Sequence, residues 1–92
     1  IFSRQLEGIA NQNDVLIIIS TSGNSKNIIN AVKFAKKKKI KVLGLLGKNG
    51  GVCKNLIKNK IIINSNNTAR IQEMHIMIGH VICDLIEEQF GI

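Results

Sequence analysis

The stretch that decides the fold is Asp14-Val15-Leu16-Ile17-Ile18-Ile19, which runs directly into Ser20-Thr21-Ser22-Gly23-Asn24-Ser25. Its aliphatic side chains follow one another without alternating polar residues. A short apolar run of this kind is typical of a strand covered on both faces, as in a parallel sheet. The polar segment after it is predicted to be a loop, and the apolar spacing beyond this loop predicts a helix over residues 26–38.

The rest of the chain continues this alternation of strands and helices. Apolar runs at residues 41–46 and 61–63 predict two more strands, with one or two helical turns between them at residues 52–57. A long helix is predicted over residues 69–89, and residues 1–10 also show helical spacing. Strands that alternate with helices imply a parallel sheet with right-handed crossovers. We therefore predict an α/β fold, a three-layer α-β-α sandwich around a parallel sheet.

Length and composition place the chain among small globular domains. Its 92 residues are 45% hydrophobic and 21% charged, which excludes a disordered or low-complexity chain. A sheet of three strands leaves two edges unpaired, so we expect either part of a larger α/β domain, which we favour, or tight assembly with other chains. No apolar run approaches the roughly 18 residues of a membrane span, and no signal peptide is visible. We therefore expect no membrane partner and a cytoplasmic location.

The chain is basic, with 13 Lys and Arg residues against 6 Asp and Glu residues and a net charge of +7. We interpret most of this charge as a solvated surface, because the lysines at residues 36–39 lie near a predicted helix C-terminus, where cations suit the helix dipole. Nucleic-acid binding through these lysines is the alternative. The chain has three Phe and neither Trp nor Tyr to stack on bases, so we expect no nucleic-acid partner.

The two cysteines, Cys53 and Cys83, lie far apart in the sequence and form no CxxC pair. Such a spacing gives neither a disulfide framework nor a metal-binding pattern. We therefore predict two reduced, partly buried thiols.

The segment from Ser20 to Ser25 is the strongest candidate for a binding site. It follows a buried strand and precedes a helix, and ligands of open α/β sheets bind at the carboxyl ends of the strands. The N–H groups at the next helix start, together with the helix dipole, favour an anion there. Gly23 allows the backbone to come close to a ligand. Hydroxyl donors are supplied by Ser20, Thr21, Ser22 and Ser25.

The donors of this loop favour one class of ligand. The loop has neither a GxxxxGK[ST] nor a GxGxxG pattern, which argues against a nucleotide. Neutral donors clustered at a helix N-terminus suit a phosphate monoester, such as a sugar phosphate. The alternative is an ordinary helix cap, in which a Ser or Asn side chain satisfies the orphan amides.

The long helix has one apolar face and carries both histidines on a helical wheel of about 100° per residue. His75 lies at the edge of that face, and we predict that it packs structurally. His80 lies on the opposite side, where it either pairs with Asp84 in solvent or serves as an acid, base or metal ligand. Gln72 precedes it by about 12 Å along the axis, so a metal between them needs further ligands from elsewhere. The predicted apolar face consists of Ile71, Met74, Ile78, Val81, Ile82, Leu85 and Ile86.

Four segments occur in an order that resembles the C-terminal half of bacterial phosphoheptose isomerases, enzymes of the sugar isomerase (SIS) domain family. These segments are Ile1-Phe2-Ser3-Arg4, the loop from Ser20 to Ser25, Gly47-Lys48-Asn49-Gly50-Gly51, and Arg70-Ile71-Gln72-Glu73-Met74-His75. The resemblance covers the whole chain. It implies that residues 1–92 form the C-terminal part of a single Rossmann-like SIS domain with a five-stranded parallel sheet.

The resemblance also implies a function, an aldose–ketose isomerisation of sedoheptulose 7-phosphate to D-glycero-D-manno-heptose 7-phosphate. This step leads to the heptose of lipopolysaccharide or capsule, and the family implies a homotetramer with shared active sites. By position, Gln72 and His80 would contribute to the substrate and zinc site, with His80 as an acid/base. The substrate phosphate would be held by Ser20, Thr21, Ser22 and Ser25. The family's other zinc ligands lie in an upstream half that these 92 residues lack, so we expect this chain alone to be inactive.

Two other interpretations remain open at this point. One is a non-catalytic relative, similar to the replication-initiator-associating protein of enteric bacteria, which this chain resembles in Cys83-Asp84-Leu85-Ile86. That relative lacks a His at the position of His80 and carries an Arg in the serine loop, so His80 and Ser22 favour the enzyme. The other is a phosphosugar-sensing regulatory domain, which would keep the serine loop and need no acid or base.

Overall fold

The computed structural model describes residues 13–91, so the helix predicted over residues 1–10 lies outside the described part of the chain. Each of the other predicted elements is present, with bounds that differ from the prediction by at most two residues. In chain order the elements are β1 (Val15–Ser20), α2 (Lys26–Lys37), β2 (Lys41–Gly47), α3 (Cys53–Leu56), β3 (Asn59–Ile63) and α4 (Thr68–Phe90).

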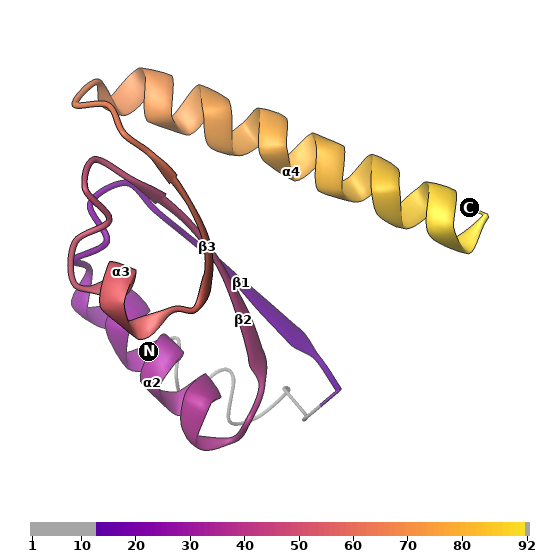
Figure 1. Ribbon diagram of the computed structural model, residues 1–92, viewed down its shortest axis with the longest axis horizontal. Coiled ribbons are helices and arrows are strands. Elements are labelled where there is room, and N and C mark those ends of the chain that lie inside the picture. The colour runs from indigo at the N-terminus through magenta and orange to yellow at the C-terminus, as the bar shows by residue number, and fades with distance from the viewer. Residues whose placement is uncertain (1–12, 92) are drawn as a thin grey trace.

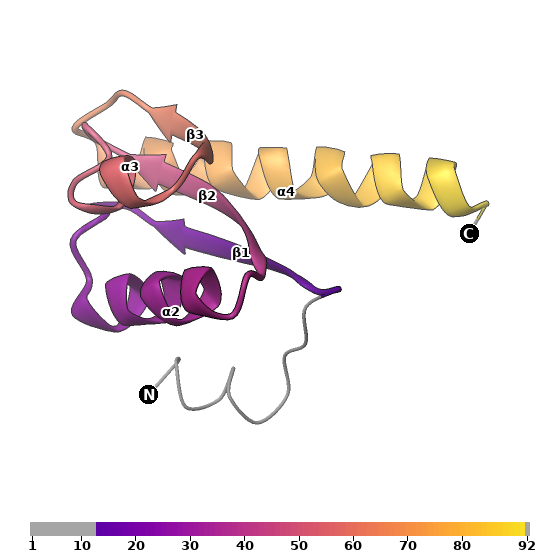
Figure 2. The same cartoon turned by 60° about the horizontal axis from the view of Figure 1, so that its bottom comes forward.

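The three strands form a parallel sheet in the order β1-β2-β3, with Val15 opposite Lys41 and Leu43 opposite Asn59. Helices α2 and α3 cover one face of this sheet, and α4 crosses the other (Figures 1 and 2). The predicted three-layer α/β architecture is therefore confirmed. Because all strands run in the same direction, their carboxyl ends meet at one edge of the sheet, where ligands of such folds bind.

The main core lies between the sheet and the two helices α2 and α3. It is aliphatic apart from one thiol, and its buried members are Ile18, Val32, Leu46, Cys53 and Ile57. Burial raises the pKa of the Cys53 thiol above its ordinary value because the thiolate would lose its hydration. Cys53 is therefore an inert packing residue. Both cysteines are free, as predicted, but the prediction that Cys83 is partly buried is wrong, because it lies exposed on α4.

Helix α4 begins with a cap, in which the Asn67 side chain accepts a hydrogen bond from the Arg70 N–H at 3.2 Å, and it ends at Gly91 with φ +71°. Only Ile71 and His75 are buried on this helix. The predicted apolar face is therefore covered only near its start. Its later members Val81, Leu85 and Ile86 are exposed, because α4 runs on beyond the sheet (Figure 1). None of the helices within residues 13–91 is both long and apolar enough to cross a membrane.

Candidate functional site

The serine loop, residues 20–25, connects the carboxyl end of β1 to the start of α2. Ser20 is buried, and its Oγ accepts a hydrogen bond from the Gly23 N–H at 3.0 Å. The Ser22 Oγ accepts one from the Asn24 N–H at 3.1 Å. Ser25 occupies the N-cap position of α2 but makes no side-chain cap bond, and the first turn of α2 has no acidic residue. The alternative of an ordinary helix cap by a Ser or Asn side chain is therefore not what the structure shows at the start of α2, and the first N–H groups of this helix have no side-chain cap.

The serine loop is held in place by the turn that follows β2. Gly23 has φ +70°, and a Cβ on it would collide with the backbone carbonyl of Gly50. Gly51 has φ +56°, and a Cβ there would collide with the Asn24 Oδ1 at 2.5 Å. That same Oδ1 accepts a hydrogen bond from the Val52 N–H at 2.9 Å. The two loops thus pack backbone against backbone, which leaves the serine loop little freedom to move.

Helix α4 is attached to the same edge of the sheet. The His75 Nε2 lies 2.8 Å from the Leu46 carbonyl oxygen, to which its N–H donates, and His75 is only 2% exposed. Its Nδ1 is buried without a hydrogen bond partner within residues 13–91. Gly47 ends β2, where a Cβ would lie 2.6 Å from both the Thr21 carbonyl oxygen and the Ile71 side chain. The predicted structural role of His75 is confirmed, and α4 packs closely beside the serine loop.

A hollow of about 480 Å³ lies between the end of β1 and α4, and we call it the β1–α4 hollow. It brings together Thr21, Gln72 and His80, three of the predicted site residues. Gln72 and His80 are both exposed, so their polar groups are accessible, and His80 is not a core histidine, as the wheel predicted. The other residues that line the β1–α4 hollow are Ile19, His75, Ile76 and Gly79. Ser20, Ser22 and Ser25 belong to the adjoining loop but do not line this hollow.

Gln72 and His80 supply a side-chain amide oxygen and an imidazole nitrogen, and the imidazole is a common zinc ligand. Structural and catalytic zinc sites need three or four protein ligands. Within residues 13–91 no group of three or more His, Cys, Asp or Glu side chains is placed to hold a metal ion. These two side chains therefore fit only part of a zinc site, and the remaining ligands would have to come from outside the described residues.

The sequence alone assigns no individual role to three residues that shape the site. Asn24 joins the two loops through its side chain, and Gly47 and Gly51 permit close contacts between segments. The glycines of the turn after β2 are a visible signal, since paired glycines favour a left-handed backbone. No signal in the sequence assigns the partner of Asn24, which lies 28 residues away.

A hydroxyl-rich loop between a buried strand and a helix, beside a hollow that holds an amide and an imidazole, is typical of α/β proteins that bind phosphorylated ligands. The family model of the SIS domain matches residues 1–47, about half of the chain. The chain belongs to the SIS domain family.

Two curated relatives illustrate how closely the chain matches known proteins. It is 56% identical over 90 residues to the phosphoheptose isomerase of a Nitratiruptor species, covering 98% of this chain and 48% of that protein. It is 52% identical over 92 residues to the phosphoheptose isomerase of Clostridium acetobutylicum, covering 99% of this chain and 47% of that protein. The chain thus spans about half the length of the curated relatives it matches.

Two solved structures are similar to the fold described above. A phosphoheptose isomerase from Francisella tularensis matches 95% of this chain and 49% of its own, with a TM-score of 0.90 and 38% identity. The phosphoheptose isomerase from Neisseria gonorrhoeae matches 92% of this chain and 49% of its own, with a TM-score of 0.89 and 42% identity. The elements of residues 13–91 are therefore arranged as in about half of these enzymes.

Proposed function

We propose that the protein containing this chain is an aldose–ketose isomerase that converts sedoheptulose 7-phosphate to D-glycero-D-manno-heptose 7-phosphate. The observation that carries the proposal is the β1–α4 hollow, in which Thr21 of the serine loop lies with Gln72 and His80. The relatives named phosphoheptose isomerase support it, since their identity to this chain extends over nearly its whole length. The reaction would serve heptose biosynthesis for lipopolysaccharide or capsule.

The serine loop would hold the phosphate of the sugar. No side chain caps the start of α2, and no acidic residue in its first turn opposes an anion. The Ser20 Oγ accepts from the Gly23 N–H, which leaves its own O–H to donate to a phosphate oxygen. Thr21, Ser22 and Ser25 would supply the other hydroxyl donors. Binding of the phosphate at the serine loop would orient the sugar and would not take part in the chemical step.

The β1–α4 hollow would hold the reacting end of the sugar. Isomerisation moves a proton between C1 and C2 through an enediol, which needs a base that takes the carbon-bound proton, an acid that donates a proton to the carbonyl oxygen, and groups that bind the substrate oxygens. We assign proton transfer to the His80 imidazole and binding of a substrate oxygen to the Gln72 amide. Gln72 and His80 would also be this chain's contribution to a zinc site. A bound zinc ion would polarise the sugar carbonyl.

We further propose that the protein is a homotetramer that acts in the cytoplasm. The exposed apolar side chains on the second half of α4 support assembly, since large uncovered apolar surfaces are typical of interfaces. They include Val81, which is 51% exposed, Leu85, which is 59% exposed, and Phe90, which is 73% exposed. Light scattering coupled to gel filtration of the intact protein would measure the assembly directly.

The test of the proposed function is the substitution His80→Ala in the intact protein, with turnover of sedoheptulose 7-phosphate as the measurement. Because general acid–base catalysis contributes about 10²- to 10⁴-fold, we expect kcat to fall by at least about 100-fold. Zinc content, measured by mass spectrometry, separates the two roles of His80: a loss of zinc with a loss of activity indicates a ligand, and a loss of activity alone indicates proton transfer.

Two results would contradict the proposal. Turnover of the His80→Ala variant within about threefold of the parent corresponds to less than about 1 kcal/mol of barrier and would exclude a catalytic role. Sugar-phosphate binding by the parent protein without any turnover would instead support the phosphosugar-sensing alternative. An inactive parent that binds no sugar phosphate would support a protein-binding relative.

A further inference from the structure

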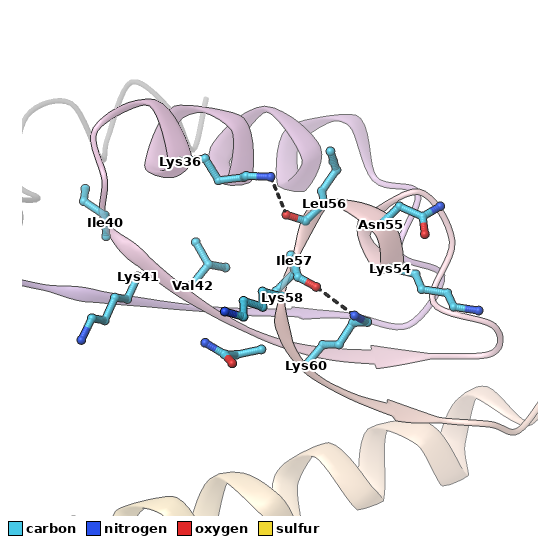
Figure 3. Close-up of a pocket in the computed structure, with 11 residues that line it drawn as sticks. Lys36, Ile40, Lys41, Val42, Lys54, Asn55, Leu56, Ile57, Lys58 and Lys60 are labelled. Atoms are coloured by element: carbon cyan, nitrogen blue, oxygen red, sulfur yellow. Dashed lines mark hydrogen bonds between the residues drawn. The ribbon is translucent and has the colours of Figure 1, made fainter.

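A second hollow, of about 460 Å³, lies at the amino ends of β2 and β3, and we call it the lysine pocket (Figure 3). Among the residues that the structure describes, five lysines line it and no acidic residue does. They come from α2, β2, α3, the connection from α3 to β3, and β3 itself. Segments that are separate in the sequence therefore converge on one basic site, whose lysines are Lys36, Lys41, Lys54, Lys58 and Lys60.

Two of these lysines are held in place before any ligand arrives. The Lys36 Nζ donates to the Leu56 carbonyl oxygen at 3.0 Å, and the Lys60 Nζ donates to the Ile57 carbonyl oxygen at 3.0 Å (Figure 3). An ammonium group has three N–H donors, so each retains two for a ligand. Side chains fixed in this way lose less conformational entropy when they bind, which favours affinity.

The charges are spread along the pocket rather than gathered at one point. In Figure 3, Lys41 and Lys54 lie on opposite flanks, with Lys58 and Lys60 between them. Ammonium groups that lie along a pocket suit an anion with several linked charged groups better than a single phosphate. Like charges that line one pocket repel one another, and a ligand with several negative charges relieves that repulsion. The pocket volume also falls within the range of small-molecule sites, about 300–1,000 Å³.

The lining of the pocket favours a phosphate chain over a nucleobase. It includes the apolar residues Ile40 and Ile57, which are 6% and 3% exposed. A buried apolar wall lowers the local dielectric constant, so each ion pair formed beside it is stronger than in open water. No aromatic side chain from residues 13–91 lines the pocket, so this part of the chain offers no surface there on which a base would stack.

We propose that the lysine pocket is a binding site for a small anion that carries two or more linked phosphate groups, such as inorganic diphosphate or triphosphate. The pocket is at the amino ends of the strands, whereas the serine loop follows the carboxyl end of β1. The site is therefore additional to the sugar-phosphate site proposed above and does not depend on that assignment.

The experiment is calorimetric titration of inorganic triphosphate into the intact protein and into two matched variants. The pocket variant carries Lys41→Gln and Lys58→Gln, which remove two exposed lysines and keep the two that donate to carbonyl oxygens. The control variant carries Lys33→Gln and Lys37→Gln, which remove the same charge from exposed positions of α2 outside the pocket. We expect the pocket variant to bind at least about tenfold more weakly, a loss of about 1.4 kcal/mol, and the control variant to bind within about twofold of the parent.

Several outcomes would overturn the proposal. The first is that the parent shows no measurable binding of triphosphate. The second is that the pocket variant binds triphosphate as tightly as the parent. The third is an equal loss of affinity in both variants, which would indicate attraction to overall charge only. The fourth is that a single-stranded oligonucleotide binds the parent more tightly than triphosphate does and is weakened equally in both variants. That result would indicate a nucleic-acid-binding surface and not a specific pocket.

Two further measurements keep the result specific. Thermal unfolding of each variant shows whether it is folded, and the pair Lys41→Arg and Lys58→Arg, which keeps the charge, should restore binding to within about threefold of the parent. Triphosphate binding that is weakened by Ser22→Ala with Ser25→Ala, and not by the pocket variant, would place the ligand in the serine loop and overturn the proposal. The two proposals are therefore tested separately. An inactive protein could still bind triphosphate in the titration, and a protein that binds no triphosphate could still be active in the isomerase assay.

Discussion

The two ends of the parallel sheet are built in different ways. At the carboxyl end, Gly23, Gly47 and Gly51 let neighbouring segments approach so closely that an added Cβ would collide with backbone or with a buried side chain. At the amino end, five lysine side chains line the hollow, and four of them are exposed. Geometry is therefore fixed by the main chain at one end, whereas charge is supplied by side chains at the other.

This difference predicts how each end tolerates substitution. Where backbone packs on backbone, no rotamer change can make room for an added atom, so even one methyl group costs folding free energy. Where exposed side chains line a hollow, a substitution removes charge and leaves the packing intact. Glycine variants at the carboxyl end should mainly change stability, and lysine variants at the amino end should mainly change binding.

The largest expected effect is that of Gly23→Ala in the intact protein. A Cβ at Gly23 would collide with the Gly50 carbonyl, and the residue has φ +70°, which strains any L side chain. We expect a loss of unfolding free energy of more than about 3 kcal/mol, measured by chemical denaturation, or failure to fold.

The matched control for Gly23→Ala is Gly79→Ala, the same change in the middle of α4. A Cβ there would meet no atom of the described residues within 4 Å, and alanine favours a helix over glycine by about 1 kcal/mol. We therefore expect opposite signs for the two substitutions. Equal effects would mean that the close contact between the two loops does not constrain the fold.

The second effect in size is that of His75→Ala, with His80→Ala as its control on the same helix. Removal of His75 leaves a cavity and a Leu46 carbonyl oxygen without its donor. We expect a loss of about 2–3 kcal/mol of unfolding free energy. His80 is exposed, so its removal should change stability by less than about 0.5 kcal/mol.

The variants of the two histidines thus distinguish an effect on stability from an effect on activity within one helix. The expected pattern is an unstable His75 variant and a stable, inactive His80 variant. A His80→Ala protein that unfolds as easily as the His75→Ala protein would show that its loss of activity reports on folding rather than on chemistry.

The order of elements could be predicted from the sequence because local signals agree with the fold. The apolar run before Ser20 forms a strand, and the helical spacing after residue 26 gives α2. The serine loop was also predictable, since it combines hydroxyl residues with a helix start. These features depend on residues that are neighbours along the chain, and such features are what periodicity reports.

The rest depends on which segments meet in space. The apolar pattern of α4 continues past the sheet, so the wheel could not tell the buried Ile71 from the exposed Leu85. The same limit misplaced Cys83. The bond from His75 to Leu46 joins residues 29 positions apart, and the lysine pocket gathers residues from several segments. No pattern within one segment carries such information.

A smaller effect, on affinity rather than on folding, is expected for Ser22→Ala combined with Ser25→Ala. The Ser25 side chain makes no cap bond to α2, and the Ser22 hydroxyl accepts a local hydrogen bond from the Asn24 N–H, which leaves its own O–H to donate. Loss of two donors to a charged phosphate should weaken sugar-phosphate binding by about tenfold or more. Calorimetry with sedoheptulose 7-phosphate measures this, and unchanged affinity would reject the phosphate assignment of the loop.

The smallest effect expected is on the stability of the Lys41→Gln and Lys58→Gln variant. Both side chains are exposed, and no acidic residue of the described part of the chain lines their pocket, so the substitutions reduce repulsion among neighbouring ammonium groups. We expect the unfolding free energy to change by less than about 0.5 kcal/mol, with a slight gain. Chemical denaturation of this variant beside the control with Lys33→Gln and Lys37→Gln measures the difference. A loss above about 1 kcal/mol confined to the pocket variant would mean that these lysines hold the amino end of the sheet together, and the contrast between the two ends would then be wrong.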